Sequence, residues 1–282
     1  MKISSKRNQK FHFSPLRYPG GKTFLFPFFD AVIQNNGLKN VTYVEPFAGG
    51  AGAALALLFT GKVKRVVIND LDRAIYSFWR SAIFDSEKFI KKIHNTPITI
   101  QEWRKQKKIY QKSRSSYFDL GFATFFLNRT NMSGILDGGP IGGINQKGQY
   151  RINARFNKDG LVKRIQQLSK YRNRISVFNK DGVELIKDYL NKKNAFIYLD
   201  PPYFEKGATL YLNHYKKSDH ESLAKQLNQN PDAFWLLTYD NKREVKSLYI
   251  DRKIINFSLN YNAYKLRRGK EMMIMSDALV TS

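Results

Sequence analysis

Short apolar segments alternate with helical stretches along this chain, and the alternation restricts its possible folds more than any other feature. Each segment is too short for a buried helix and contains β-branched or aromatic residues, which indicates a buried strand. The segments are 41–44, 66–68, 175–178, 195–199 and 234–239. Strands separated by helices favour a parallel, doubly wound sheet. We therefore predict an α/β protein.

Two helix boundaries are also visible in the sequence. The apolar stretch 53–60 follows the first expected strand and is closed by Gly61, which predicts a helix between the first two strands. Further on, Ser218 is followed three residues later by Glu221, the pattern of a capping box. We expect a second helix to begin there.

The strand pattern is interrupted over 71–174, where the sequence has helical character and contains a glycine-rich loop, 134–148. This stretch is strongly basic. Residues 88–114 contain nine Lys or Arg residues and one acid, and residues 151–174 contain eight Lys or Arg residues and one acid. A one-sided charge bias of this kind favours an inserted domain with a positive face over an ordinary solvated insertion. The predicted organisation is an inserted domain at 73–174 and a second domain formed by 1–72 and 175–282.

The net charge points to the class of partner. There are 48 Lys and Arg residues against 23 Asp and Glu residues, which gives +25. Such an imbalance favours a polyanion, usually nucleic acid. A generally basic or ribosome-associated protein is the alternative.

The composition excludes several kinds of site. There is no cysteine, which excludes disulfides, thiolate metal sites and thiol nucleophiles. Four scattered histidines show no metal-ligand spacing, so we expect no metal. The longest apolar run, 51–59, is too short to span a bilayer. We expect a cytoplasmic protein that does not engage a membrane.

A glycine-rich segment, Glu45–Gly52, directly follows the first expected strand and opens a helix. Glycines in such a turn let the backbone approach a ligand. The next strand ends in Asp70, about twenty residues later, the spacing at which a carboxylate grips a ribose diol. The turn lacks Gly-Lys-Ser/Thr and is therefore not a phosphate-binding P-loop. We predict a nucleoside-like ligand here; a structural turn with a surface aspartate is the alternative.

A second candidate site follows the expected strand 195–199, where the chain continues as Asp200-Pro201-Pro202-Tyr203. The prolines end the strand and stiffen the turn. They fix the Asp200 carboxylate and the Pro201 carbonyl at the carboxyl edge of the sheet, where open α/β sheets bind ligands. Two adjacent acceptors suit both hydrogens of an amino group, and Tyr203 offers an aromatic face to a planar base.

Six motifs occur in order along nearly the whole chain. They are 15–22 (PLRYPGGK), 44–51 (VEPFAGGA), Asn69-Asp70, 126–130 (FLNRT), Asp200–Tyr203 (DPPY) and 270–275 (KEMMIM). This set and its order resemble the Dam-type DNA adenine methyltransferases, the alpha group of the DPPY-motif enzymes. The resemblance implies a Rossmann-like, S-adenosylmethionine-dependent methyltransferase sheet with an inserted, mainly helical DNA-recognition domain.

The resemblance also implies roles for individual residues. Cofactor-binding residues would be Tyr18, Lys22, Phe47, Gly49, Gly50, Asp70 and Asp181. The catalytic residues that hold the target adenine would be Asp200, Pro201, Pro202 and Tyr203. Asn128 and Arg129 would lie on the DNA. The positive charge of the surrounding sequence adds further candidates for phosphate contacts: Lys6, Arg7, Arg17, Arg151, Arg155, Arg172 and Arg174.

The expected reaction is site-specific transfer of a methyl group from S-adenosylmethionine, without a metal, to N6 of an adenine flipped out of double-stranded DNA. We expect a monomer, and any cognate restriction endonuclease would act separately. Three alternatives remain open on the sequence: an RNA adenine methyltransferase, a non-catalytic DNA-binding module on the same fold, and a nucleotide-dependent oxidoreductase. The last leaves the Asp200–Tyr203 turn and the charge unexplained.

Overall fold

The computed structural model describes residues 13–18, 20–203, 215–263 and 265–281, and it describes no side chains in 258–270. These residues form two compact units. The first, called the sheet unit, comprises Lys22–Leu71 and Phe178–Ser282. The second, called the helical unit, comprises His12–Gly21 and Asp72–Val177. The segment 12–21, which we expected in the same domain as the rest of 1–72, thus groups with the inserted helices.

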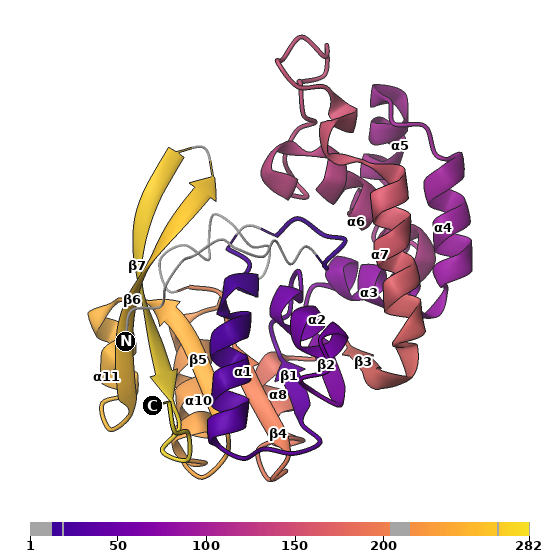
Figure 1. Ribbon diagram of the computed structural model, residues 1–282. Helices are drawn as coiled ribbons and strands as arrows, with labels where there is room; N and C mark the ends of the chain where they lie inside the picture. The colour runs from indigo at the N-terminus through magenta and orange to yellow at the C-terminus, as the bar shows by residue number, and fades with distance from the viewer. Residues whose placement is uncertain (1–12, 19, 204–214, 264, 282) are drawn as a thin grey trace. The chain divides into compact units, whose positions relative to one another are not determined.

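A seven-stranded sheet contains all the strands of the described chain (Figure 1). They are β1 (Thr42–Glu45), β2 (Arg65–Asn69), β3 (Ile175–Phe178), β4 (Ala195–Leu199), β5 (Trp235–Asp240), β6 (Lys253–Ala263) and β7 (Lys265–Met275). Their order is β3-β2-β1-β4-β5-β7-β6. The predicted α/β fold is confirmed, and the five expected strands match β1 to β5 within one or two residues.

The predicted parallel sheet is extended at one edge by two antiparallel strands. β1 pairs in parallel with β2 and β4, and β4 with β5. β7 instead lies antiparallel between β5 and β6. The sequence hides β6 and β7 because only part of each strand is apolar; in β7 this is Met272–Met275, and charged residues precede it.

Helices cover both faces of the sheet because alternate side chains of each buried strand point in opposite directions. Tyr198 packs its ring 4.6 Å from that of Phe29 in helix α1. Its neighbour Ile197 belongs to the core cluster that also holds Leu185 of α8 and Leu223 of α10. The helical elements of this unit are η1 (Thr23–Leu25), α1 (Phe26–Asn35), α2 (Gly52–Phe59), α8 (Gly182–Lys187), α10 (Lys217–Asn228) and α11 (Arg243–Leu248).

Helix α10 begins one residue before the predicted capping box. The carboxylate of Asp219 accepts the backbone N–H of Lys216 at 2.7 Å. Asp219 therefore takes the role that we assigned to Glu221, whose carboxylate lies 3.8 Å from the ammonium of Lys217. Both acids lie in the first two turns, and only the local backbone geometry distinguishes them.

The helical unit is built around phenylalanine rings. Phe125 and Phe126 of α6 are fully buried, as expected for core residues, and the Phe125 ring stacks on Phe78 at 5.9 Å. Gly121 lets α6 approach α3, because a Cβ there would lie 2.3 Å from the Ser77 carbonyl oxygen. Its elements are α3 (Arg73–Phe84), α4 (Ser86–Asn95), α5 (Ile100–Gln111), α6 (Tyr117–Thr130), η2 (Met132–Gly134), η3 (Ile152–Arg155), α7 (Lys158–Lys170) and η4 (Arg172–Arg174).

None of the helices in the described parts of the chain has the length and apolar content needed to cross a bilayer.

Candidate active site

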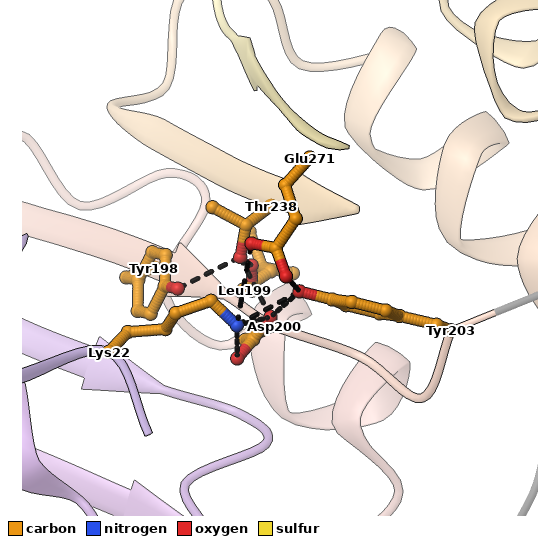
Figure 2. Close-up of polar contacts among 7 residues, drawn as sticks. All are labelled: Lys22, Tyr198, Leu199, Asp200, Tyr203, Thr238 and Glu271. Atoms are coloured by element: carbon orange, nitrogen blue, oxygen red, sulfur yellow. Dashed lines mark hydrogen bonds and ion pairs between the residues drawn. The ribbon is translucent and has the colours of Figure 1, made fainter. Parts of the chain in front are cut away.

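A buried ion pair lies where β4 ends. Asp200 follows the last residue of β4, and Lys22 directly precedes η1. The Lys22 ammonium lies 3.0 Å from Asp200 Oδ1 and 2.8 Å from Oδ2, so it bridges both carboxylate oxygens (Figure 2). The Lys22 side chain is only 5% exposed and that of Asp200 22%. Two of the residues predicted from separate motifs are therefore brought into direct contact.

Tyr203 and Glu271 complete a four-residue polar cluster with this pair. The Tyr203 hydroxyl accepts a hydrogen bond from Lys22 at 2.9 Å and donates to Glu271 Oε1 at 2.8 Å. It also lies 3.2 Å from Asp200 Oδ1. The Glu271 side chain comes from β7, is 1% exposed, and places Oε2 3.8 Å from the Lys22 ammonium.

Two hydroxyls on adjacent strands form a chain that ends on the Asp200 carboxylate. Thr238 of β5 donates to Asp200 Oδ1 at 2.8 Å. The hydroxyl of Tyr198, in β4, lies 2.8 Å from the Thr238 hydroxyl (Figure 2). Pro201 is buried and Pro202 is partly buried, so the turn after Asp200 is held on both sides. The carboxylate is thus preorganised.

The electrostatics of the cluster favour a cation. It holds two carboxyl groups and one ammonium, which sum to −1 when all are ionised. Burial first, and then the charges of Asp200 and Glu271, raise the pKa of Tyr203 well above its usual value. Burial, followed by the charge of Asp200, does the same to the pKa of Tyr198. Both phenols therefore stay protonated and act as hydrogen-bond donors.

The glycine-rich turn lies at the carboxyl ends of β1 and β2. The backbone N–H of Gly49 donates to Asp70 Oδ2 at 2.9 Å. The glycine-rich turn and Asp70, which we predicted to bind a nucleoside together, are therefore in contact. Gly49 and Ala51 both have positive φ, 46° and 45°, which folds the turn tightly. Gly50 is buried beside them. The Asn69 side chain donates to the Pro46 carbonyl at 2.8 Å and fixes the turn to β2.

Asp181 and Phe47 both lie at the start of α8. Asp181 is exposed and caps this helix, accepting the backbone N–H groups of Val183 and Glu184 at 2.8 and 3.1 Å. The Phe47 ring occupies the space beside Gly182, because a Cβ on that glycine would lie 2.5 Å from Phe47 Cζ. Contact of Asp181 with an adenosine ring stays a prediction, as do the cofactor roles of Phe47 and Gly49.

Glu45, the first residue of the glycine-rich segment, is a buried acid to which we assigned no role. Its Oε1 accepts from the Tyr43 hydroxyl at 3.1 Å and from the Ala54 backbone N–H at 3.2 Å. Burial is the largest influence on this carboxyl and raises its pKa to about 8, while the two hydrogen bonds oppose the rise. Glu45 is therefore largely protonated at neutral pH.

Tyr18 and Lys22, which we expected in one cofactor pocket, fall in different units. Tyr18 belongs to the helical unit and Lys22 to the sheet unit. The backbone carbonyl of Tyr18 accepts the N–H of Gly21 at 3.2 Å, which closes a turn in this segment. A cofactor contact of Tyr18 stays a prediction.

Asn128 has a different surrounding from the one expected of a DNA contact. It is 2% exposed. Its Nδ2 donates to the carbonyls of Arg17 and Gly134 at 2.7 and 3.0 Å, and its Oδ1 accepts the Arg17 N–H at 2.7 Å. Every hydrogen of the amide is engaged internally. This argues against a direct base contact and shows that Asn128 ties segment 12–21 to the loop after α6.

Arg129 belongs to a group of four arginines in the helical unit, called here the arginine cluster: Arg17, Arg129, Arg155 and Arg164. The side chains of three of them donate to backbone carbonyls. Arg17 Nη1 donates to Asn131 O at 3.1 Å, Arg129 Nε to Arg155 O at 2.8 Å, and Arg164 Nη1 to Ser14 O at 2.9 Å. Across the ranges that the structure describes, no carboxylate forms an ion pair with any of the four.

Repulsion among the four guanidinium groups favours the binding of an anion at this cluster. Burial first, and then the positive charges of Arg164, Arg17 and Arg155, together lower the pKa of Arg129 to about 9. Burial also lowers the pKa of Arg17, with Arg155 as the second cause. Arg155 and the other predicted contact, Arg151, are exposed. The candidate phosphate contacts Lys6 and Arg7 lie outside the described residues.

The described residues contain no group of three or more His, Asp or Glu side chains arranged to hold a metal ion. A contact of Asp70 with a ribose diol stays a prediction.

The residues missed by sequence reasoning are Thr238, Tyr198 and Glu271. Thr238 and Tyr198 appear only as members of apolar strands. Glu271 carries the clearer signal, because it is an acid that directly precedes an apolar run within a quoted motif. Its partners, Tyr203 and Lys22, are distant in sequence, and only the fold identifies them.

Several known proteins are similar to this chain over most of its length. Type II methyltransferase M.MjaIII of Methanocaldococcus jannaschii is 24% identical over 225 residues, covering 72% of this chain and 73% of that protein. Type II methyltransferase M1.LlaDCHI of Lactococcus lactis subsp. cremoris is 23% identical over 282 residues, covering 90% and 91%. A solved rRNA methyltransferase, aviRa from Streptomyces viridochromogenes, is 13% identical with a TM-score of 0.40, covering 93% of this chain and 88% of that one.

The family match agrees with the geometry. The D12 class N6 adenine-specific DNA methyltransferases match residues 18–263, a span that contains Lys22, the glycine turn with Asp70, and the Asp200–Tyr203 turn. The structure brings Lys22 onto Asp200 and Tyr203, and Asp70 onto the glycine turn. The chain therefore belongs to the D12 class of N6 adenine-specific DNA methyltransferases, and its reaction is the methylation of adenine in DNA.

Proposed function

We propose that the methyl donor is S-adenosylmethionine and that it binds the sheet unit along the carboxyl ends of β1 and β2. The contact between the Gly49 N–H and Asp70 supports this, since it places a carboxylate beside a turn that a ligand can approach closely. Phe47 and Asp181 flank the same edge and would border the nucleoside. When bound, S-adenosylmethionine supplies a methyl group already activated by the positive sulfur.

The target adenine takes Asp200 as its principal partner. The Asp200 carboxylate and the Pro201 carbonyl accept the two hydrogens of the exocyclic amino group. This favours a tetrahedral nitrogen whose lone pair is directed at the methyl carbon, because an amino group conjugated with the ring is otherwise a poor nucleophile. Alignment of the two reactants supplies much of the rate. The net negative charge of the cluster stabilises the positive charge that develops on nitrogen.

Proton transfer completes the reaction. The new N–C bond uses the nitrogen lone pair, and the electrons of the broken S–C bond stay on sulfur. Nitrogen is then positive and must lose one of its two hydrogens. Asp200 is the nearest base in this arrangement and accepts that proton before passing it to water. Tyr203 stays protonated throughout because of its raised pKa and keeps its ring available for the base.

The target base must leave the duplex to reach Asp200. An adenine paired inside B-form DNA cannot place its amino group against a carboxylate that is only 22% exposed. Unstacking and unpairing cost a few kcal/mol. Stacking of the flipped base on Tyr203 offsets part of this cost.

The helical unit serves as the DNA-recognition domain. The arginine cluster supports this, since four guanidinium groups without a carboxylate partner in the described chain favour the binding of backbone phosphates. Arg151 and Arg155 add exposed positive charge. Phosphate contacts position the duplex, whereas base contacts select the sequence. Asn128 acts indirectly, by holding the segment that carries Arg17.

The names of the relatives, which are Type II methyltransferases, support a role beside a restriction endonuclease. This chain would act in the cytoplasm as a monomer on double-stranded DNA, since one flipped base needs one active site. A cognate restriction endonuclease would be a separate protein that cuts the same sequence when it is unmethylated.

The observation that carries this proposal is the Lys22–Asp200–Tyr203 cluster at the end of β4. It is tested by expressing the chain in cells that lack adenine methylation and sequencing their DNA with methylation-sensitive reads. Methyladenine in one short motif is the expected result. Asp200→Asn, which keeps the shape of the side chain, should lower methylation to less than about one hundredth.

Two results would contradict the proposal. The DNA could stay unmodified although the wild-type protein folds and binds S-adenosylmethionine. This result would indicate that the substrate is RNA or that the protein binds DNA without catalysis. Unchanged methylation by Asp200→Asn would remove Asp200 from the reaction. Methyladenine scattered without a motif would keep the reaction but show that the helical unit binds DNA without selecting a sequence.

A further inference from the structure

Other side chains contact both oxygens of the Asp200 carboxylate. Its Oδ1 lies 2.8 Å from the Thr238 hydroxyl, 3.0 Å from the Lys22 ammonium and 3.2 Å from the Tyr203 hydroxyl. Its Oδ2 lies 2.8 Å from the same ammonium. An incoming amino group needs one of these oxygens. The Lys22 ammonium lies on both oxygens and so competes with the amino group for Asp200. Withdrawal of Lys22 would remove this competition.

Withdrawal of a buried ammonium is costly without a second anion. The Lys22 side chain is 5% exposed, so water cannot replace the lost partner. An unpaired charge in such a place carries a large desolvation penalty. Glu271 offers the alternative: its Oε2 lies 3.8 Å from the ammonium, close enough for a small side-chain movement to close the gap.

The position of Glu271 is fixed by the sheet and by Tyr203. In the sheet, Glu271 of β7 pairs with Asp240 of β5. Its other carboxylate oxygen accepts the Tyr203 hydroxyl at 2.8 Å, while that hydroxyl accepts from Lys22 at 2.9 Å (Figure 2). Tyr203 can therefore keep both contacts while the ammonium moves from one carboxylate to the other.

We propose that Glu271 is a positioning residue that receives the Lys22 ammonium when the target amino group takes Asp200. The inference rests on the proposed role of Asp200 and adds a residue that lies beyond the span matched by the family. Lys22 then pairs with the Asp200 carboxylate only until the target amino group binds. Without a charge at position 271, Lys22 stays on Asp200 and competes with the target base.

The test uses Glu271→Gln, which keeps the length of the side chain and an acceptor for Tyr203 but removes the charge. The first readout is the emission of 2-aminopurine placed next to the target adenine in a duplex that carries the recognised motif. The target keeps its 6-amino group in this duplex, and the emission of the neighbouring 2-aminopurine rises when the adenine leaves the stack. The second is the kinetics of methylation. We expect at least tenfold weaker formation of the emissive complex and a loss of tenfold or more in kcat/KM, with Glu271→Asp recovering part of both.

Lys22→Met distinguishes this mechanism from simple damage. Once no ammonium covers Asp200, Glu271→Gln should add less than a twofold change in 2-aminopurine emission. Asp240→Asn, which removes a buried carboxylate from the paired position in β5, is the matched control and should change emission by less than twofold. An equally large effect of Glu271→Gln in the Lys22→Met background would overturn the proposal, as would wild-type behaviour of Glu271→Gln.

The failure of the proposed function gives a different pattern. If the wild-type protein methylates no adenine, both the role of Asp200 and that of Glu271 are overturned. If the wild-type protein is active and only the Glu271 comparison fails, the proposed function stands and Glu271 is a structural acid of β7.

Discussion

Asn128 binds both polar groups of the Arg17 backbone, which is 111 residues away in sequence. Its Oδ1 accepts the Arg17 N–H, and its Nδ2 donates to the Arg17 carbonyl, each at 2.7 Å. The same amide also donates to the Gly134 carbonyl at 3.0 Å. One side chain therefore joins the segment before Lys22 to the last turn of α6 and to the loop beyond it.

Asn128→Ala should destabilise the helical unit by about 2–4 kcal/mol, because it leaves buried backbone groups of Arg17 and Gly134 without partners. Urea unfolding monitored by circular dichroism measures the change. Asn145→Ala, at an exposed position of the same unit, should stay within about 0.5 kcal/mol of the wild type. A loss of DNA affinity by Asn128→Ala without any loss of stability would instead restore Asn128 as a direct DNA contact.

Gly182→Ala should disturb the cofactor edge through Phe47. The added Cβ would lie 2.5 Å from Phe47 Cζ, so the ring must move. We expect a cost of about 1–3 kcal/mol in stability and a rise of at least tenfold in the dissociation constant for S-adenosylmethionine, measured by titration calorimetry. Gly160→Ala is the control, since its Cβ would meet nothing closer than 3.5 Å. Unchanged cofactor affinity in Gly182→Ala would show that Phe47 does not line the pocket.

Glu45 should make the sheet unit less stable as the pH rises. Burial raises its pKa to about 8 in the folded protein, whereas an exposed glutamate titrates near 4.5, so the folded state binds more protons between these values. The stabilising effect of the protonated carboxyl is complete below about pH 4.5 and declines towards pH 8. Glu45→Gln cannot ionise. Its stability relative to the wild type should therefore rise by about 2–4 kcal/mol between pH 5 and pH 8, as measured by urea unfolding. The same difference at both pH values would contradict the buried, protonated state.

The arginine cluster should account for part of the salt dependence of DNA binding. The slope of log affinity against log salt should fall in magnitude by about 1 for Arg129→Gln and again for Arg17→Gln, as measured by fluorescence anisotropy. Lys39→Gln removes the same charge from an exposed residue before β1, at the sheet edge opposite to Asp70 and Asp200, and should leave the slope unchanged. Equal changes in all three variants would reduce the cluster to general surface charge.

Local pattern predicted the parts of the fold that local physics controls. The strands from β1 to β5 are short, apolar and bounded by turn residues, so their periodicity identifies them. β6 and β7 were not predicted, because an antiparallel pair at a sheet edge needs only part of its length to be apolar. Each of these strands also depends on its partner for pairing.

The sequence by itself determined the α/β fold, the family and the acceptors Asp200 and Asp70, because these are set by residue type and by spacing along single elements. Only the tertiary structure decided which groups meet: Lys22 on Asp200, Glu271 on Tyr203, and Asn128 on Arg17. Those contacts join residues 68 to 178 positions apart. Their energies come from burial and pairing of charges and amides in the folded core, which no local pattern encodes.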